Sequence, residues 1–143
     1  MLRVGNYLEL DKNQYDENWL IVRKPDELPG FVKYVPVLSP SPELFRKYRD
    51  AFHVGAFNLE FFDQVYVPQF LKELIENTEA LSILQSLASV SKEKDILLAC
   101  YCGVESMCHR SIIAGILLGM GAEIDAEPKY LKYYEQYQIL NKK

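Results

Sequence analysis

All three cysteines of the chain lie in one stretch of twelve residues, Cys100 to Ser111, with a histidine and an arginine. An apolar strand candidate over 95–99 precedes the stretch, and a helix candidate over 112–120 follows it. Backbone N–H groups in the first turn of a helix have no intrahelical partner, and the helix dipole adds about half a positive charge there. A strand, a polar loop and a helix in this order predict a site that stabilises a phosphate, a carboxylate or a thiolate.

Two of the cysteines are candidates for a reactive thiol. Cys108 lies near the predicted helix start, where the helix N-terminus, His109 or Arg110 would lower the pKa of its thiol. We assign Cys108 as nucleophile or redox thiol and His109 as its proton partner, with Cys102, just past the strand, as a second candidate. The matching enzyme class is a cysteine-dependent hydrolase or transferase. The alternative is a non-catalytic binding domain with buried structural thiols, the interpretation we favour for Cys100.

The same loop carries candidate ligands for an anion. Arg110 could hold an oxyanion through two parallel hydrogen bonds, or it could form a salt bridge with Glu105. The expected ligand is an anionic small molecule of the phosphate or nucleotide type. The expected anion-binding residues are Arg23, Gly103, Ser106, Arg110 and Ser111.

A zinc site is a further alternative, because Cys100, Cys102, Cys108 and His109 supply four potential ligand atoms. Structural zinc sites favour ligand pairs two to four residues apart on turns. On a helix, however, adjacent residues 108 and 109 would point about 100° apart, whereas residues 100 and 102 share one face of a strand. This spacing argues against zinc, so we expect neither a metal nor a cofactor.

Composition limits the classes of protein that this chain can represent. Its 143 residues are 49% hydrophobic and 25% charged, which is ordinary for one globular domain. The net charge of −4 does not indicate a nucleic-acid-binding face, although a local basic patch stays open. No apolar run approaches the roughly 20 residues that span a bilayer, and the N-terminus lacks the apolar core of a signal peptide. We therefore expect no membrane association and a cytoplasmic location.

Strand and helix signals alternate along the chain. Ser41 is well placed as an N-cap before Pro42, whereas Pro36 makes the strand around it irregular or an edge strand. Pro68 should kink or restart the helix that contains it. The expected strands cover 2–10, 19–24, 31–38, 95–99 and 122–124. The expected helices cover 42–52, 58–77, 78–91, 112–120 and 127–140. This alternation predicts an α/β fold over residues 1–143, a single layered domain with a central, mostly parallel sheet flanked by helices.

Two further patterns concern packing. Ser111, Gly115 and Gly119 fall four apart, so they form a ridge of small residues that should let their helix approach the sheet closely. The last helix carries an aromatic stripe, which suits docking onto the parent domain or, alternatively, a homodimer contact. We favour docking and leave monomer or homodimer open. The stripe consists of Tyr130, Tyr133, Tyr134, Tyr137 and Leu140.

The order and spacing of several motifs resemble the YeaO-like family of domains of unknown function, DUF family number 488, over about residues 2–124. The family has a strand ending in arginine and proline, a Leu-Ser-Pro-Ser helix entry, a Phe-x-x-x-Tyr helix, and a strand cysteine followed later by Cys-His-Arg. The matching segments here are Trp19–Pro25, Leu38–Leu44, Phe62 with Tyr66, Leu97–Cys100 and Cys108–Arg110.

This resemblance implies a compact cytosolic α/β domain and no established activity. It adds Ser41 and Tyr66 to the positions of interest, for which a helix cap and a core aromatic are the structural alternatives. The chain departs from the family at Cys102, where family members often carry an acidic residue. A role for that carboxylate cannot be transferred to this chain.

Overall fold

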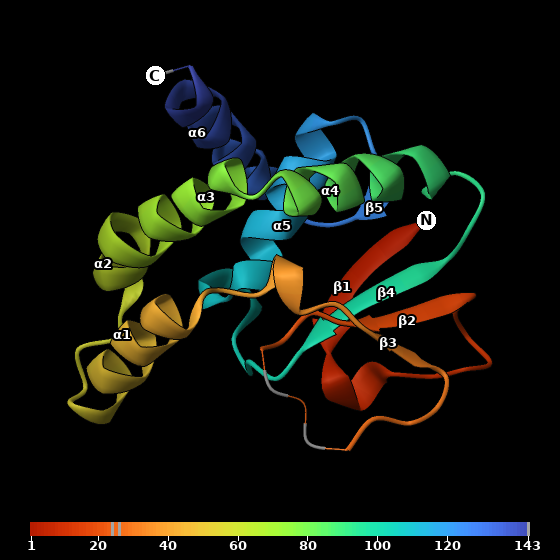
Figure 1. The fold of residues 1–143 in the computed structure, drawn as a ribbon, viewed down its shortest axis with the longest axis horizontal. Coiled ribbons are helices and arrows are strands. Elements are labelled where there is room, and N and C mark those ends of the chain that lie inside the picture. The colour runs from red at the N-terminus through yellow and green to blue at the C-terminus, as the bar shows by residue number, and fades with distance from the viewer. Residues whose placement is uncertain (24, 26, 143) are drawn as a thin grey trace.

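The computed structural model describes residues 1–23, 25 and 27–142. In this part of the chain five strands form one parallel sheet in the order β3-β2-β4-β1-β5 (Figure 1). The central strand β4 is buried along its whole length, as expected for an apolar run covered on both faces. The strands are β1 (Leu2–Asn6), β2 (Glu17–Leu20), β3 (Val32–Tyr34), β4 (Ile96–Cys100) and β5 (Ile124–Asp125).

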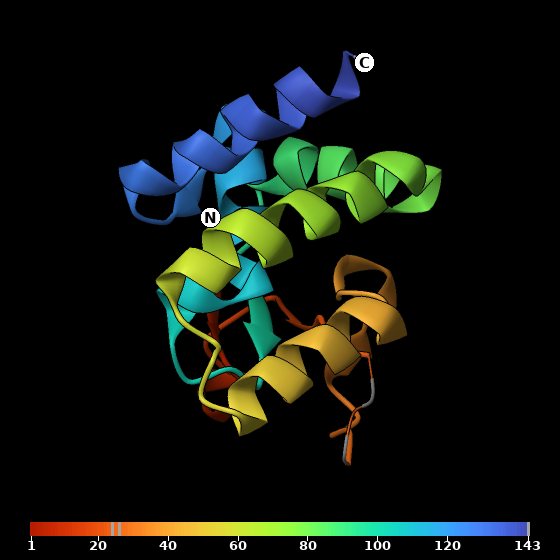
Figure 2. The ribbon, with the colours of Figure 1, turned by 90° about the vertical axis from the view of Figure 1, so that its left-hand side faces the viewer.

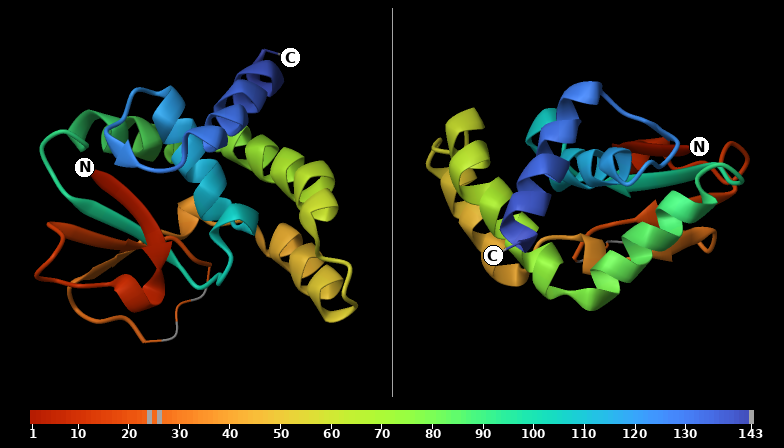
Figure 3. Two further views of the ribbon diagram at one scale, coloured as in Figure 1. Left: turned by 180° about the vertical axis from the view of Figure 1, so that it is seen from behind. Right: turned by 90° about the horizontal axis from the view of Figure 1, so that it is seen from above.

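The helices gather mainly beyond the C-terminal ends of the strands. Figure 2 shows α6, α3 and α1 stacked on that side of the molecule, and Figure 3 shows α5 between the strands and this stack. The α-helices are α1 (Pro42–His53), α2 (Leu59–Phe61), α3 (Val67–Glu76), α4 (Thr78–Val90), α5 (His109–Gly119) and α6 (Leu131–Asn141). Shorter 3-10 turns cover Tyr7–Glu9, Pro36–Leu38, Glu105–Met107 and Pro128–Tyr130, and a π-helical turn covers Phe62–Tyr66.

The α/β fold with a parallel sheet is confirmed, but the first three strands are shorter than predicted, and the end of the third prediction, Pro36–Leu38, is a 3-10 turn. β1 ends at Asn6 because the Asn6 and Glu9 side chains form a capping box that starts a 3-10 turn. β2 ends at Leu20, and the predicted end of this strand at Lys24 lies outside the described residues. β3 is an edge strand, as predicted.

The predicted start of α1 is confirmed. Ser41 is its N-cap and accepts a hydrogen bond from the backbone N–H of Leu44, with Pro42 at the first helical position. The segment predicted as one helix around Pro68 is broken more extensively than expected. Because Pro68 has no N–H to donate, the chain passes from α2 through the π-helical turn into α3.

The ridge of small residues on α5 faces α6 rather than the sheet, which corrects the sequence-based expectation. A Cβ atom on Gly115 would lie 2.0 Å from the backbone oxygen of Tyr130, and one on Gly119 would lie 1.9 Å from the Tyr134 ring. Tyr130, Tyr133 and Tyr137 are all at most 5% exposed, so the aromatic stripe docks onto its own domain as predicted. Glycine is required at 115 because the backbone of the 3-10 turn before α6 lies against it, and at 119 because the Tyr134 ring of α6 does.

Gly115→Ala should therefore destabilise the protein. The added methyl group meets a main-chain oxygen that cannot rotate away, so we expect a net loss of about 1–3 kcal/mol in the free energy of unfolding. Urea denaturation followed by circular dichroism measures this loss. Gly103→Ala is the matched control, because a Cβ there has no neighbour within 4 Å. Equal midpoints for the two variants would contradict the close helix contact.

Candidate functional site

The candidate site lies at the C-terminal ends of β2 and β4. The chain leaves β2 towards the outer strand β3, whereas it leaves β4 through α5 towards β5 at the opposite edge. Adjacent strands whose connections run in opposite directions leave a crevice between them, which is where open α/β sheets bind ligands. Val22 and Arg23, after β2, and Tyr101 and Cys102, after β4, line a cavity of about 490 Å³ at this point.

A second wall of the cavity comes from α1. Phe45, Arg46, Tyr48 and Arg49 line it, and Tyr66 contributes from the π-helical turn. Tyr48 packs against the neighbouring rings, with ring centroids 6.0 Å from Phe45 and 6.4 Å from Tyr66. Burial raises the pKa of Tyr66 well above its ordinary value, so its hydroxyl stays protonated at neutral pH.

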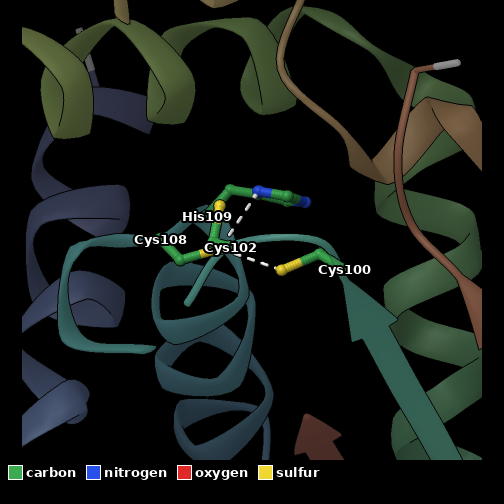
Figure 4. Close-up of side chains that lie close together, drawn as sticks. All are labelled: Cys100, Cys102, Cys108 and His109. Carbon is green, nitrogen blue, oxygen red and sulfur yellow. Dashed lines mark hydrogen bonds between the residues drawn. The ribbon is translucent and has the colours of Figure 1, made fainter. Parts of the chain in front are cut away.

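Beside the cavity, the three cysteines and His109 form one compact group, which we call the thiol cluster (Figure 4). Cys100 ends β4, Cys102 follows two residues later, Cys108 is the N-cap of α5 and His109 begins that helix. Their sulfur and Nδ1 atoms all lie within 4.8 Å of one another. The Sγ atoms of Cys100 and Cys108 are 3.0 Å apart, and Cys108 Sγ is 3.5 Å from His109 Nδ1.

This geometry overturns the spacing argument that kept the four side chains apart. Cys108 has extended backbone angles, with φ −133° and ψ 151°, because it caps the helix rather than belonging to it. The helical step of about 100° between neighbouring side chains therefore does not apply between Cys108 and His109. Both side chains turn towards the end of β4.

The His109 ring is held in one tautomer. Its Nε2 atom lies 2.6 Å from the carbonyl oxygen of Ile21, an acceptor, so Nε2 carries the proton and donates it. Nδ1 is then left with a lone pair that faces the sulfur atoms. Burial lowers the pKa of His109, which favours this neutral form.

Arg110 is 4% exposed and points towards the sheet, where it does not line the cavity. Its Nη1 atom donates to the carbonyl oxygen of Gly5 at 2.8 Å and to Cys100 Sγ at 3.5 Å. The described residues offer it no carboxylate partner within salt-bridge distance. The alternative partner Glu105 instead accepts a hydrogen bond from the Tyr130 hydroxyl. A buried cation needs a counter-charge, which the thiol cluster is placed to supply.

The thiols differ in the direction of their pKa shifts. Hydrogen bonds from the Cys102 and Cys108 thiols lower the pKa of Cys100, and the positive charge of Arg110 acts in the same direction. The hydrogen bond to Cys100 raises the pKa of Cys102, and burial raises that of Cys108. Cys100, which is fully buried, is thus the thiol whose ionised form the cluster favours, whereas Cys102 is the thiol that reaches the cavity.

The predicted site residues fall into two groups. The cavity brings together Arg23, Tyr66, Cys102 and His109. Arg23 is half-buried, and its Nε and Nη2 atoms both donate to the carbonyl oxygen of Pro40, at 3.2 and 3.1 Å. The predicted residues that do not line the cavity are Ser41, Gly103, Ser106, Cys108, Arg110 and Ser111.

Two residues of the second group have structural roles. Ser41 caps α1 and donates its hydroxyl to Glu73. The Ser111 hydroxyl is buried and donates to the carbonyl oxygen of Cys108 at 2.8 Å, which closes the first turn of α5. Cys108 is 1% exposed, so a substrate could not reach its sulfur atom in this structure. The role of nucleophile that the sequence suggests for Cys108 would require the thiol cluster to open.

Sequence reasoning missed Arg46, Arg49, Tyr48 and Tyr101. A signal for the two arginines was present, because Pro42, Phe45, Arg46 and Arg49 recur at helical spacing and all line the cavity. From its sequence alone, however, a short and mostly polar helix such as α1 is typical of an ordinary surface helix. Its role becomes visible only when the other side of the cavity is known.

Comparison with family models gives a match to the active DUF488-N3 subclade over residues 9–121. The chain belongs to the DUF488 family. The resemblance predicted from the motifs is thereby confirmed. Comparisons of this DUF488 chain with curated proteins and with solved structures found no match. Within the described residues, no helix is long and apolar enough to cross a membrane.

The burial of the thiols predicts an order of modification in the DUF488 protein. With reductant and chelator present, iodoacetamide should alkylate Cys102 well before Cys100 and Cys108, which are at most 1% exposed. Peptide mass spectrometry over a time course measures the three rates. In denaturant all three should react alike, which serves as the control. Native rates for Cys108 that equal those of Cys102 would show that the cluster is open to solvent.

Proposed function

We propose that this DUF488 domain binds a nucleotide-like anion in the cavity between α1 and the ends of β2 and β4. The observation that carries the proposal is the cavity wall, where Arg23, Arg46 and Arg49 lie among aromatic side chains. The described lining residues include no carboxylate. The cavity volume of about 490 Å³ falls in the usual range for small-molecule sites, about 300–1,000 Å³.

Charge supports an anionic ligand. The protein as a whole carries a formal net charge of −4, yet three arginines lie on this one concave wall, with a single exposed ion pair to the described residues, Arg49 Nε to Asp50 Oδ1 at 3.9 Å, among them. A guanidinium group presents its N–H donors in a planar fork that matches phosphate oxygens. The largely apolar surroundings strengthen such contacts because water screens them less.

The aromatic side chains favour a ligand that also carries a flat ring. Phe45 and Tyr48 come from α1, Tyr66 from the π-helical turn and Tyr101 from the loop after β4. Ring faces of this kind stack on nucleobases, and each such stacking contact is worth about 1–3 kcal/mol in single-stranded nucleic acid complexes. Inorganic phosphate alone would leave these rings unused. A nucleoside phosphate would use both the rings and the arginines.

Enzymatic activity is a separate proposal. The description of the matching family model as an active subclade supports it, as does the position of Cys102 and His109 on the cavity wall. A cysteine-dependent hydrolase or transferase would have to attack through Cys102, the thiol that reaches the ligand. A cytoplasmic location, as expected from the sequence, would give the cavity access to soluble nucleotides. A monomeric or homodimeric state stays a prediction.

Isothermal titration tests the ligand class with three probes: a nucleoside monophosphate, the same nucleoside and inorganic phosphate. We expect the nucleoside monophosphate to bind most tightly. Arg49→Ala should weaken its binding about tenfold or more, because a hydrogen bond to a charged group contributes about 1.5–3 kcal/mol.

Lys47→Ala is the matched control, since it removes the same charge from the same helix at a side chain that contacts Gln69 rather than the cavity. It should leave the affinity within about twofold, because an exposed charge contributes little. Equal losses of affinity in the two variants would show that the effect comes from the net charge of the protein and not from contact of Arg49 with the ligand. Absence of binding by all three probes would reject the proposed function.

A further inference from the structure

The thiol cluster has the dimensions of a zinc site. Zinc lies about 2.3 Å from sulfur and about 2.0–2.1 Å from nitrogen in tetrahedral sites, so pairs of ligand atoms lie about 3.6–3.8 Å apart. Two of the six distances within the cluster are 3.0 Å, between Cys100 Sγ and Cys108 Sγ, and 3.5 Å, between Cys108 Sγ and His109 Nδ1. All four atoms lie within 4.8 Å of one another. Small side-chain rotations bring this group onto a tetrahedron.

The chemistry of the four donor atoms selects the metal. Three sulfur atoms and one imidazole nitrogen form the Cys3His set of structural zinc sites, whereas magnesium and calcium prefer oxygen. Metal-binding histidines usually donate their second ring N–H to a carbonyl or carboxylate group. His109 does so through Nε2 to the carbonyl oxygen of Ile21, which leaves Nδ1 directed at the sulfur atoms.

The buried charges also balance. A zinc ion with three thiolates carries a net charge of −1, and the guanidinium group of Arg110 lies 3.5 Å from Cys100 Sγ. The site and Arg110 together are therefore neutral, which limits the electrostatic penalty of burying them. Arg110 needs a counter-charge at this place, because the described residues give it no carboxylate partner.

We infer that Cys100, Cys102, Cys108 and His109 bind one zinc ion in a closed tetrahedral site that joins the end of β4 to the start of α5. Cys102 and His109 also line the cavity, so the ion lies at its wall. The thiols then act as ligands, so attack by Cys102 would be confined to the metal-free protein, and the ion links the loop after β4 to the first residues of α5. Ligand binding by the arginines of α1 does not depend on the metal for its chemistry.

The first experiment measures zinc in the full-length protein, purified with reductant and without chelator. Elemental analysis should give one zinc ion per chain, and removal of the ion should lower the melting temperature. Cobalt added to the metal-free protein should give the intense visible bands of a tetrahedral site and thiolate charge-transfer absorption. Metal-free, reduced protein that binds neither zinc nor cobalt would overturn the inference.

Variants then assign the ligands. His109→Gln should lower zinc affinity by more than the roughly 10- to 100-fold that loss of an outer-shell partner causes. His53→Gln is the matched control, because His53 is the other histidine of the chain and is exposed on α1. Cys102→Ala removes a half-buried loop ligand, so the chain should still fold while its cobalt spectrum loses thiolate intensity. Unchanged zinc affinity in both His109→Gln and Cys102→Ala would overturn the assignment.

Two further measurements separate this inference from its alternatives. Peptide mapping without reduction would reveal a disulfide between Cys100 and Cys108, and its presence in freshly isolated protein would contradict a zinc site. Arg49→Ala should keep one zinc ion per chain while its affinity for the nucleotide falls. If the unmodified protein holds zinc but binds no nucleotide, the proposed function is rejected and the metal site stands.

Discussion

The guanidinium group of Arg110 pairs with the thiol cluster in the interior, and the site is built around this contact. Arg110 lies in the first turn of α5, donates to the carbonyl oxygen of Gly5 on β1 and reaches Cys100 at the end of β4. One cation thus ties two neighbouring strands to the helix that follows them. Because Arg110 is almost fully buried, its positive charge needs a counter-charge nearby, which the cysteine sulfur atoms can supply.

Close packing on the far side of α5 holds this arrangement in place. Gly115 lets the 3-10 turn before α6 approach α5 at backbone distance, Gly119 accommodates the Tyr134 ring, and the buried Tyr133 and Tyr137 of α6 pack beside them. The first turn of α5 therefore has little freedom to move relative to the sheet. A binding site gains from such support, because a fixed wall keeps polar groups aimed at the ligand without an ordering cost on binding.

Features that arise from local interactions could be predicted from the residues alone. Ser41 and Pro42 start α1 because a cap and a fixed φ act within one helical turn, and the apolar run before Cys100 forms the central strand. Part of the cavity could also be predicted, since the lining residues Arg23, Tyr66, Cys102 and His109 carry recognisable chemistry. The wall from α1 was missed, because its partner is the loop after β4, which lies far away in the chain.

The sequence by itself determined the α/β class, the position of the cysteine loop between a strand and a helix, and the aromatic stripe of the last helix, for which it favoured docking. Each of these features follows from the periodicity of apolar residues or from interactions between residues that are close together in the chain. Only the tertiary structure decided that Cys108 and His109 converge on Cys100 and that Arg110 faces the sheet. It also decided that Gly115 meets α6. These outcomes depend on the backbone angles at a helix cap and on contacts between segments that are distant in the chain. The spacing of residues along the sequence does not predict either of them.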